Sequence, residues 1–149
     1  TKGAATMMKN IATTIGNTLV GKGFTRSAAF VQAWGMTKAR HITRVVGVTV
    51  GNRQEALRRL ARYGRDQIRV ALVHEAGNQV DGNAVAVIVE VAGSRGYKMG
   101  YIARESAAIL ARALDKVGGK ISATVEDITG GTIGLNAGLC ISYKLGGVA

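Results

Sequence analysis

Two short stretches decide the fold of this chain: VALVHEAGNQVDGNAV at residues 70–85 and GYIARE at residues 100–105. Val70 and Leu72 of the first stretch alternate with Ile68 just before it as the side chains of a half-buried strand do, and a polar loop at 76–82 separates them from a second apolar run. We therefore expect two strands, at about 67–75 and about 83–91. The second stretch ends a further strand, at about 97–102, and opens an amphipathic helix at about 104–117.

The flanking sequence adds elements of the same kind on both sides. Upstream, residues 44–50 are typical of a strand, and Asn52 with Glu55 forms an Asn-x-x-Glu start that can cap a helix at about 53–63. Downstream, a glycine-rich turn at 129–134 joins two strands, at about 120–128 and about 137–145. This order of short strands in a small chain favours an α+β fold: a six-stranded β-barrel closed by two helices. We assign it to residues 44–146.

Each of the two helices has one apolar side, which we expect to face the barrel. In the first helix this side comprises Ala56, Leu57, Leu60 and Ala61. In the second helix it comprises Ala108, Ile109, Ala113, Leu114 and Val117.

Residues 1–43 form a basic extension that we expect to be mostly helical. A thin apolar stripe recurs there at three- and four-residue steps and is interrupted by Gly16; its members are Met7, Met8, Ile11, Ile15 and Leu19. A second helix is expected at about 26–40, where Phe30 and Trp34 share a side. We expect Trp34 to pack this helix onto the barrel rather than to stack on a base.

The charge of the chain points to a polyanionic partner. Its 149 residues include 20 Lys and Arg but only 9 Asp and Glu, which gives a formal net charge of +11. No acidic residue precedes Glu55, so the first third of the chain is the most basic part. Such an imbalance favours DNA, RNA or an anionic membrane surface as partner, although solubility alone would also account for it.

Other classes of protein fit the sequence poorly. No apolar stretch approaches the roughly 20 residues that cross a bilayer, and the first residues lack the pattern of a signal peptide. A single cysteine, Cys140, excludes an internal disulfide and a multi-cysteine zinc site. We therefore expect a cytoplasmic protein with no membrane partner.

An enzyme is not expected either. The two histidines, His41 and His74, have no obvious partners for nucleophilic or acid–base catalysis. The glycine-rich turn lacks the Gly-Lys-Ser/Thr ending of a phosphate loop. Glu126 and Asp127 face opposite sides of a strand, which argues against a shared metal ion. We accordingly predict no catalytic residues, metal or other cofactor.

The two opening stretches also carry a family resemblance. Asn78, Asp81 and the Asn83–Val85 segment, followed by GYIARE at 100–105, resemble the loop and helix-opening motifs of the HIRAN domain over roughly 100 residues. The resemblance implies a compact OB-like or SH3-like β-barrel with two helices. It also implies a non-catalytic module that binds single-stranded DNA, since in eukaryotic fork-remodelling enzymes this accessory domain captures a DNA 3′ end. Free-standing members occur in bacteria and their phages.

Several site residues follow from the resemblance, position by position. Asn78 and Asp81 match the loop that approaches a terminal nucleotide, although Asn and Asp also stabilise tight loops through backbone amides. Tyr101 and Arg104 match positions that stack on a base and hold a phosphate, and Arg44 lies near the family's basic first strand.

The sequence departs from the family pattern at its aromatic positions. Val80 stands in the loop, and Val45 and Val46 stand in the first strand, where aromatic side chains are expected. Aromatic stacking contributes about 1–3 kcal/mol per base, so this departure removes base stacking while phosphate attraction remains.

The predicted helix at 53–63 carries further positive charge on one side, from Arg53, Arg58, Arg59 and Arg62. These arginines are either a phosphate-contacting surface or an ordinary solvated face.

Two functions remain open on the sequence. The first is a non-catalytic DNA-binding module for single strands or ends. The second is a structural or assembly protein, such as one of phage origin, that forms homo-oligomers or binds a protein partner through residues 1–43.

Overall fold

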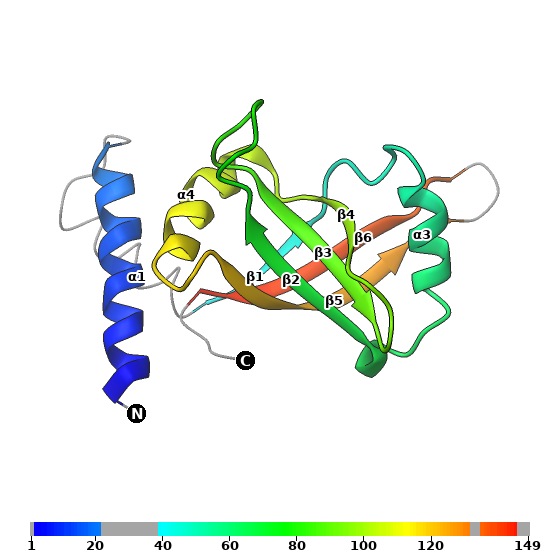
Figure 1. Ribbon diagram of the computed structural model, residues 1–149, viewed down its shortest axis with the longest axis horizontal. Helices are drawn as coiled ribbons and strands as arrows, with labels where there is room; N and C mark the ends of the chain where they lie inside the picture. The colour runs from blue at the N-terminus through cyan, green and yellow to red at the C-terminus, as the bar shows by residue number, and fades with distance from the viewer. Residues whose placement is uncertain (1, 22–38, 132–134, 146–149) are drawn as a thin grey trace.

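The computed structural model of the chain describes residues 2–21, 39–131 and 135–145. Within these residues the strands are β1 (Arg40–Arg44), β2 (Ile68–His74), β3 (Val85–Val91), β4 (Tyr97–Tyr101), β5 (Lys120–Thr129) and β6 (Gly138–Lys144). The helices are α1 (Lys2–Gly21), α3 (Arg53–Leu60) and α4 (Arg104–Asp115), with one 3-10 turn, η1 (Arg65–Gln67). In Figure 1, α1 and α4 lie at one end of the strands and α3 lies at the other.

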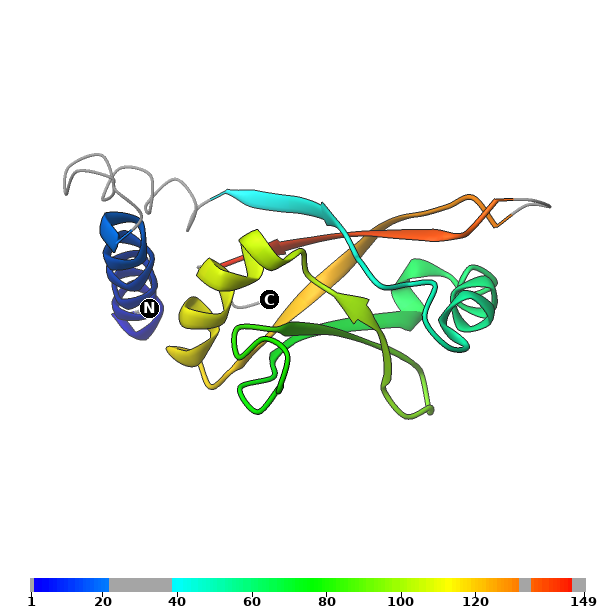
Figure 2. The ribbon, with the colours of Figure 1, turned by 90° about the horizontal axis from the view of Figure 1, so that it is seen from above.

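The strands form one antiparallel sheet in the order β1-β6-β5-β2-β3-β4. The sheet curls strongly, so that β1 and β6 run along one side of the molecule and β2 and β3 along the other, with β5 passing from one side to the other (Figure 2). Just after β1, Val46 exchanges two backbone hydrogen bonds with Tyr101, of 2.8 and 2.9 Å. This bridge connects the two edges of the sheet and closes it. The predicted α+β fold, with a six-stranded barrel-like sheet, is confirmed.

The first strand lies earlier in the chain than predicted. We expected it at residues 44–50, but β1 ends at Arg44, Val46 forms only an isolated bridge, and a turn begins at Val48. Gly47 and Gly51 both have positive φ, of 77° and 58°, a conformation that a regular strand does not contain. The β-branched residues between these glycines therefore lie in a turn, despite their strand propensity.

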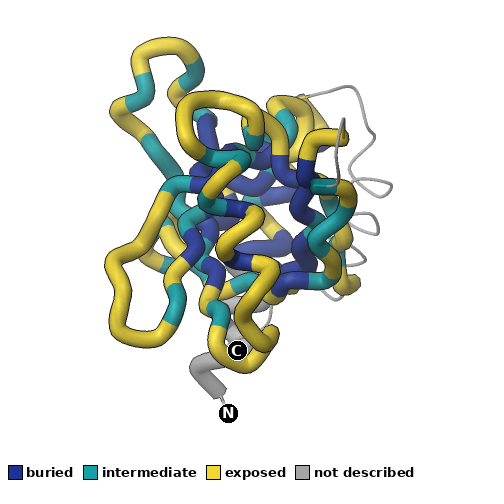
Figure 3. Tube along the Cα trace, turned by 90° about the vertical axis from the view of Figure 1, so that its right-hand side faces the viewer, coloured by how far each residue is buried: buried dark blue, intermediate teal, exposed yellow. Residues whose placement is uncertain are grey.

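The core fills the space between the curled sheet and the helices, as the buried inner trace of Figure 3 shows. Leu57 and Leu60 of α3 are buried as predicted, whereas Ala56 is half-buried and Ala61 is exposed. The predicted cap is absent, because Asn52 makes no side-chain hydrogen bond to the start of α3.

The buried side of α4 is rotated from the predicted one. Its buried residues are Ala107, Leu110, Ala111, Ala113 and Leu114. Ala108 and Ile109, which we expected to be buried, are half-buried, as is Val117 just beyond the helix. Apolar residues occupy most of this helix, so the sequence pattern fixes the direction of the face only coarsely.

The N-terminal stripe packs against the rest of this chain. Helix α1 contacts α4, and Ile11, Ile15 and Leu19 are buried. The helix continues through Gly16. The side chains of Met7 and Met8 lie outside the described residues, as does the segment 22–38, which includes most of the second predicted helix and Trp34.

Candidate nucleic-acid interface

The loop between β2 and β3 is held by its own polar side chains. Asn78 Oδ1 accepts hydrogen bonds from the backbone amides of Val80 and Asp81, at 2.9 and 3.0 Å. Asp81 Oδ1 accepts one from the amide of Asn83, at 2.9 Å. These are the local bonds that Asn and Asp commonly make in tight turns. One oxygen of each side chain thus shapes the loop, which leaves Asp81 Oδ2 for other contacts.

A histidine fastens this loop to α4. The side chain of His74, at the end of β2, is only 8% exposed; its Nδ1 lies 2.6 Å from Asp115 Oδ1 and its Nε2 lies 2.7 Å from the carbonyl oxygen of Gly82. The prediction that His74 has no obvious partner is therefore wrong. Burial on its own would lower the pKa of His74, but the bonds to Asp115 and Gly82 outweigh it, so this pKa is raised above its ordinary value.

Tyr101, at the end of β4, joins the loop from the other side. Its hydroxyl donates to Glu75 Oε1 at 2.9 Å and lies 3.1 Å from Lys98 Nζ. Lys98 also forms an ion pair with Glu75, and its Nζ lies 5.2 Å from the centre of the Tyr101 ring. The negative charge of Glu75 is therefore balanced by the positive charge of Lys98, which reduces the repulsion that a nearby phosphate would meet.

The pKa values of this pair agree with that geometry. Burial alone would raise the pKa of Glu75, but hydrogen bonds from Lys98, Asn78 and Tyr101 lower it overall. The pKa of Lys98 is raised by its bonds to Glu75 and Tyr101. Both groups are therefore charged at neutral pH.

Gly100 is required where β4 meets the chain after β1. A Cβ atom at this position would lie 2.2 Å from the carbonyl oxygen of Val46 and 2.7 Å from Cγ1 of Val45. Only glycine allows the approach that forms the bridge between Val46 and Tyr101. The glycine of the GYIARE motif thus places Tyr101 beside Val46.

These elements enclose a hollow of about 380 Å³. It is lined by Val46, Asn78, Val80, Asp81, Ala84, Tyr101, Ile102 and Arg104. Four predicted site residues, from two separate motifs, are therefore brought together. Arg104 begins α4 at the rim, where its side chain is 78% exposed and its Nε lies 3.7 Å from Asp81 Oδ2.

Comparison with known families agrees with these motifs. The family model of the HIRAN domain matches residues 28–144, which is most of the chain. The chain belongs to the HIRAN domain family. No curated protein and no solved structure matches it. HIRAN domains are DNA-binding domains that are not themselves catalytic, so the coarse expectation of a DNA-binding fold agrees with the family.

The match also bears on the division of the chain. It begins at residue 28, upstream of the barrel that we assigned to 44–146, and β1 already pairs with β6 from Arg40 onward. The boundary between residues 43 and 44 stays a prediction.

The other predicted arginines do not line the hollow beside Tyr101. Arg58, Arg59 and Arg62 lie on or just after α3, all exposed, and Arg59 forms an ion pair with Glu55 at 2.8 Å. Arg44, at the end of β1, is exposed, and its guanidinium lies over Gly138 of β6. Their role in binding stays a prediction.

Sequence reasoning missed Lys98, and it placed Arg53 only among the arginines of the helix at 53–63 and not beside Tyr101. Besides Lys98, Arg53 at the start of α3 places its Cζ 5.9 Å from the centre of the Tyr101 ring, and its Nη1 donates to the carbonyl oxygen of Gly47 at 2.9 Å. Lys98 and Tyr101 are three positions apart, so regular alternation would turn them to opposite faces, and the β-bulge in this part of β4 has no signal in the sequence. The approach of Arg53 to Tyr101 has none either, because it depends on the turn at Gly47.

The acidic groups do not form a metal centre in the part of the chain that the structure describes. No cluster of three or more His, Cys, Asp or Glu side chains occurs among residues 2–21, 39–131 and 135–145. Glu126, for example, forms an ion pair with Arg40 at 2.8 Å. Across the same residues, no helix has the length and apolar character to span a membrane.

Proposed function

We propose that this HIRAN domain is a non-catalytic module that binds single-stranded DNA or DNA ends at the hollow beside Tyr101. The observation that carries the proposal is the convergence of Asn78, Asp81, Tyr101 and Arg104 on one hollow. The two motifs that supply them are about 20 residues apart in the sequence. The family is a DNA-binding one, and the net charge of +11 favours a polyanion.

The hollow has the chemistry for one terminal nucleotide. Val46 and Val80 are 44% and 90% exposed, and with Ile102 they offer an apolar surface to a base. Arg104 at the rim supplies a positive charge for a phosphate, and because its own side chain is 78% exposed and its contact with Asp81 is long, at 3.7 Å, it can turn toward a phosphate at little cost. Arg44 and the arginines of α3 would add longer-range attraction.

Asp81 would recognise the 3′ end of the bound DNA. Its Oδ1 already accepts a backbone hydrogen bond, so Oδ2 is the atom available to accept a bond from a 3′ hydroxyl. A carboxylate accepts hydrogen bonds but repels a phosphate. We therefore expect a free 3′ hydroxyl to bind better than a 3′ phosphate.

The decisive experiment is a salt-titrated binding series, measured by fluorescence anisotropy with 5′-labelled oligonucleotides. Single-stranded DNA, duplex DNA and single strands with a 3′ phosphate are compared. We expect single strands with a free 3′ hydroxyl to bind most tightly, with an affinity that falls steeply as salt rises. Equal affinity for free and 3′-phosphorylated ends would reject end reading and leave charge attraction alone.

A matched pair of variants localises the site. Arg104→Ala removes the rim charge, whereas Arg112→Ala removes an exposed charge from the last turn of the same helix. We expect Arg104→Ala to weaken binding and to reduce the salt slope by about 1, the effect of one lost phosphate contact. An equal effect of both substitutions would show that the hollow is not the binding site.

Self-association through residues 1–43 is less well supported. The stripe that suggested it includes Ile11, Ile15 and Leu19, which are all buried within this chain. Light scattering of the full chain at increasing concentration tests it directly, and a mass that rises from one to two copies would favour assembly.

A further inference from the structure

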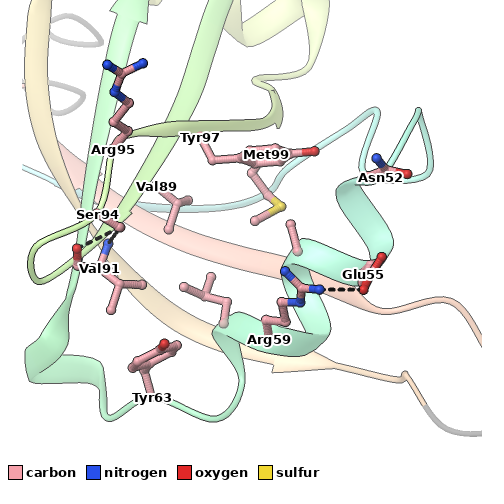
Figure 4. A pocket seen from close by; sticks show the side chains of 12 residues that line it. Asn52, Glu55, Arg59, Tyr63, Val89, Val91, Ser94, Arg95, Tyr97 and Met99 are labelled. Atoms are coloured by element: carbon pink, nitrogen blue, oxygen red, sulfur yellow. Dashed lines mark hydrogen bonds and ion pairs between the residues drawn. The ribbon is translucent and has the colours of Figure 1, made fainter.

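A second, larger hollow lies between α3 and the end of the β3–β4 hairpin (Figure 4). Its volume is about 520 Å³, and Val89, Val91 and Met99 form part of its apolar lining. Tyr63, just after α3, and Tyr97, at the start of β4, lie on opposite sides of these valines (Figure 4). The hollow shares none of its lining residues with the one beside Tyr101.

The turn before Tyr97, at the end of the β3–β4 hairpin, is fixed by hydrogen bonds and glycines. Ser94 Oγ donates to the carbonyl oxygen of Val91 and accepts from its amide, at 2.8 and 3.1 Å. Gly93 has a φ of 81°. A Cβ at Gly96 would lie 2.7 Å from Cγ2 of Ile88, so glycine allows the strands to approach just before Tyr97.

The aromatic side chains of this hollow are unusually exposed for this protein. Tyr63 and Tyr97 are 47% and 40% exposed, whereas Tyr143 is buried and the Tyr101 hydroxyl is bonded to Glu75. No hydrogen bond involves the hydroxyl of Tyr63 or Tyr97 within the described residues. Exposed aromatic faces beside an apolar floor are the platforms on which proteins stack unpaired bases.

The charge at the rim suits a nucleic-acid backbone. Arg59 lies at the edge of the hollow, and its ion pair with Glu55 joins side chains that are 71% and 62% exposed. Such a pair contributes little to stability, so Arg59 can exchange its carboxylate for a phosphate. Arg95 extends from the hairpin away from the tyrosines (Figure 4), and Arg58 and Arg62 extend the positive surface along α3.

Strand β4 connects the two hollows. Tyr97 and Met99 line the second hollow and Tyr101 lines the first, and a β-bulge opposite Val87 and Ile88 interrupts the regular alternation of β4 between them. At about 3.3 Å per residue the two tyrosines are on the order of 13 Å apart along the strand. One extended oligonucleotide could therefore contact both.

We infer that the hollow between α3 and the β3–β4 hairpin is a second binding site for single-stranded DNA. Unpaired bases stack on Tyr63 and Tyr97, while Arg59 and Arg95 contact phosphates. The inference rests on the proposed function, because the first hollow holds the end of the same strand. The second site replaces the stacking that Val46 and Val80 do not provide in the first.

The test compares three fluorescent probes: oligo(dT) of about 12 nucleotides, oligo(dT) of about 4 nucleotides, and a 12-nucleotide abasic strand. The abasic strand keeps the phosphates but has no bases. We expect the intact chain to prefer the long oligo(dT) over the abasic strand. The double variant Tyr63→Leu/Tyr97→Leu should lose this preference and bind the long oligo(dT) about 10-fold or more weakly, whereas the short probe should bind as before.

The matched control is Tyr63→Phe/Tyr97→Phe, which keeps both rings and should bind like the unaltered chain. Both tyrosines are about half-exposed, so the leucine variant should fold, and circular dichroism checks that it does. Unchanged binding of the long oligo(dT) by the leucine variant overturns the second site while the proposed function stands. Failure of the unaltered chain to bind any of the probes at low salt overturns both.

A photo-crosslinking measurement on the unaltered chain does not depend on any variant. A 12-nucleotide strand that carries 5-iodouracil at each position in turn is irradiated in the complex, and the modified peptide is identified by mass spectrometry. Adducts on Tyr63 or Tyr97 support the inference. Adducts confined to the first hollow or to other surfaces overturn it.

Discussion

Replacing Gly100 with alanine tests how the barrel closes. The new Cβ would lie 2.2 Å from the carbonyl oxygen of Val46, a backbone atom that cannot rotate away. The chain after β1 must therefore move, and the two hydrogen bonds between Val46 and Tyr101 are lost or weakened. Each such bond contributes about 0.5–1.5 kcal/mol, and overpacking in a filled space costs about 1–3 kcal/mol. We expect the free energy of unfolding to fall by about 2–6 kcal/mol.

Urea denaturation followed by far-UV circular dichroism measures this change. The matched control is Gly77→Ala, at a loop position where a Cβ would meet nothing within 4 Å and where φ is not positive. We expect the control to change stability by less than about 0.5 kcal/mol. If Gly100→Ala unfolds at the same urea concentration as the unaltered chain, the contact between β4 and Val46 does not close the barrel as described.

Two further predictions concern the first hollow. The raised pKa of His74 means that its charged form stabilises the fold: this contribution is fully present below the ordinary value of 6.5 and is lost as the pH rises through the raised pKa. Urea midpoints measured across this range should therefore fall with pH in the unaltered chain, and a His74→Gln variant that shows the same fall would contradict the assignment. Val80→Tyr places an aromatic ring at a 90% exposed position that lines the hollow, so single-stranded DNA should bind about 10-fold more tightly in anisotropy titrations. Its control is Val50→Tyr, at a 58% exposed position outside that lining. An equal gain in DNA affinity in both variants would show that any exposed aromatic ring has this effect and that the hollow has no special role.

The elements that could be predicted from sequence are those with local signals. Alternation and flanking loops placed β2, β3 and β4 to within two residues of their bounds. The predicted position of β1 was wrong because a left-handed conformation at Gly47 turns the chain, so that residues 48–50 cannot continue a strand, and the strand propensity of these residues could not show this. The buried side of α4 could be predicted only roughly, because alanine and leucine occur on most sides of that helix.

The site divides in the same way. Asn78, Asp81, Tyr101 and Arg104 could be found because they belong to two sequence motifs. The approach of Arg53 and Lys98 to Tyr101 could not be predicted, since it depends on the turn at Gly47 and on the β-bulge in β4. The second hollow was missed for a similar reason, because strands β2 and β3 lie between Tyr63 and Tyr97 in the sequence.

The pairing of β1 with β6 has a consequence for how the protein is made. Residues 40–44 leave the ribosome well before residues 138–144, the strand with which they form their ladder. Contacts of such sequence separation are slow to form, because a long loop must close first. Val45 also donates to Leu139 of β6, so the Val46 edge of the first hollow is set only once that strand is in place. A nascent chain would therefore acquire its α3 surface before it acquires a finished hollow beside Tyr101.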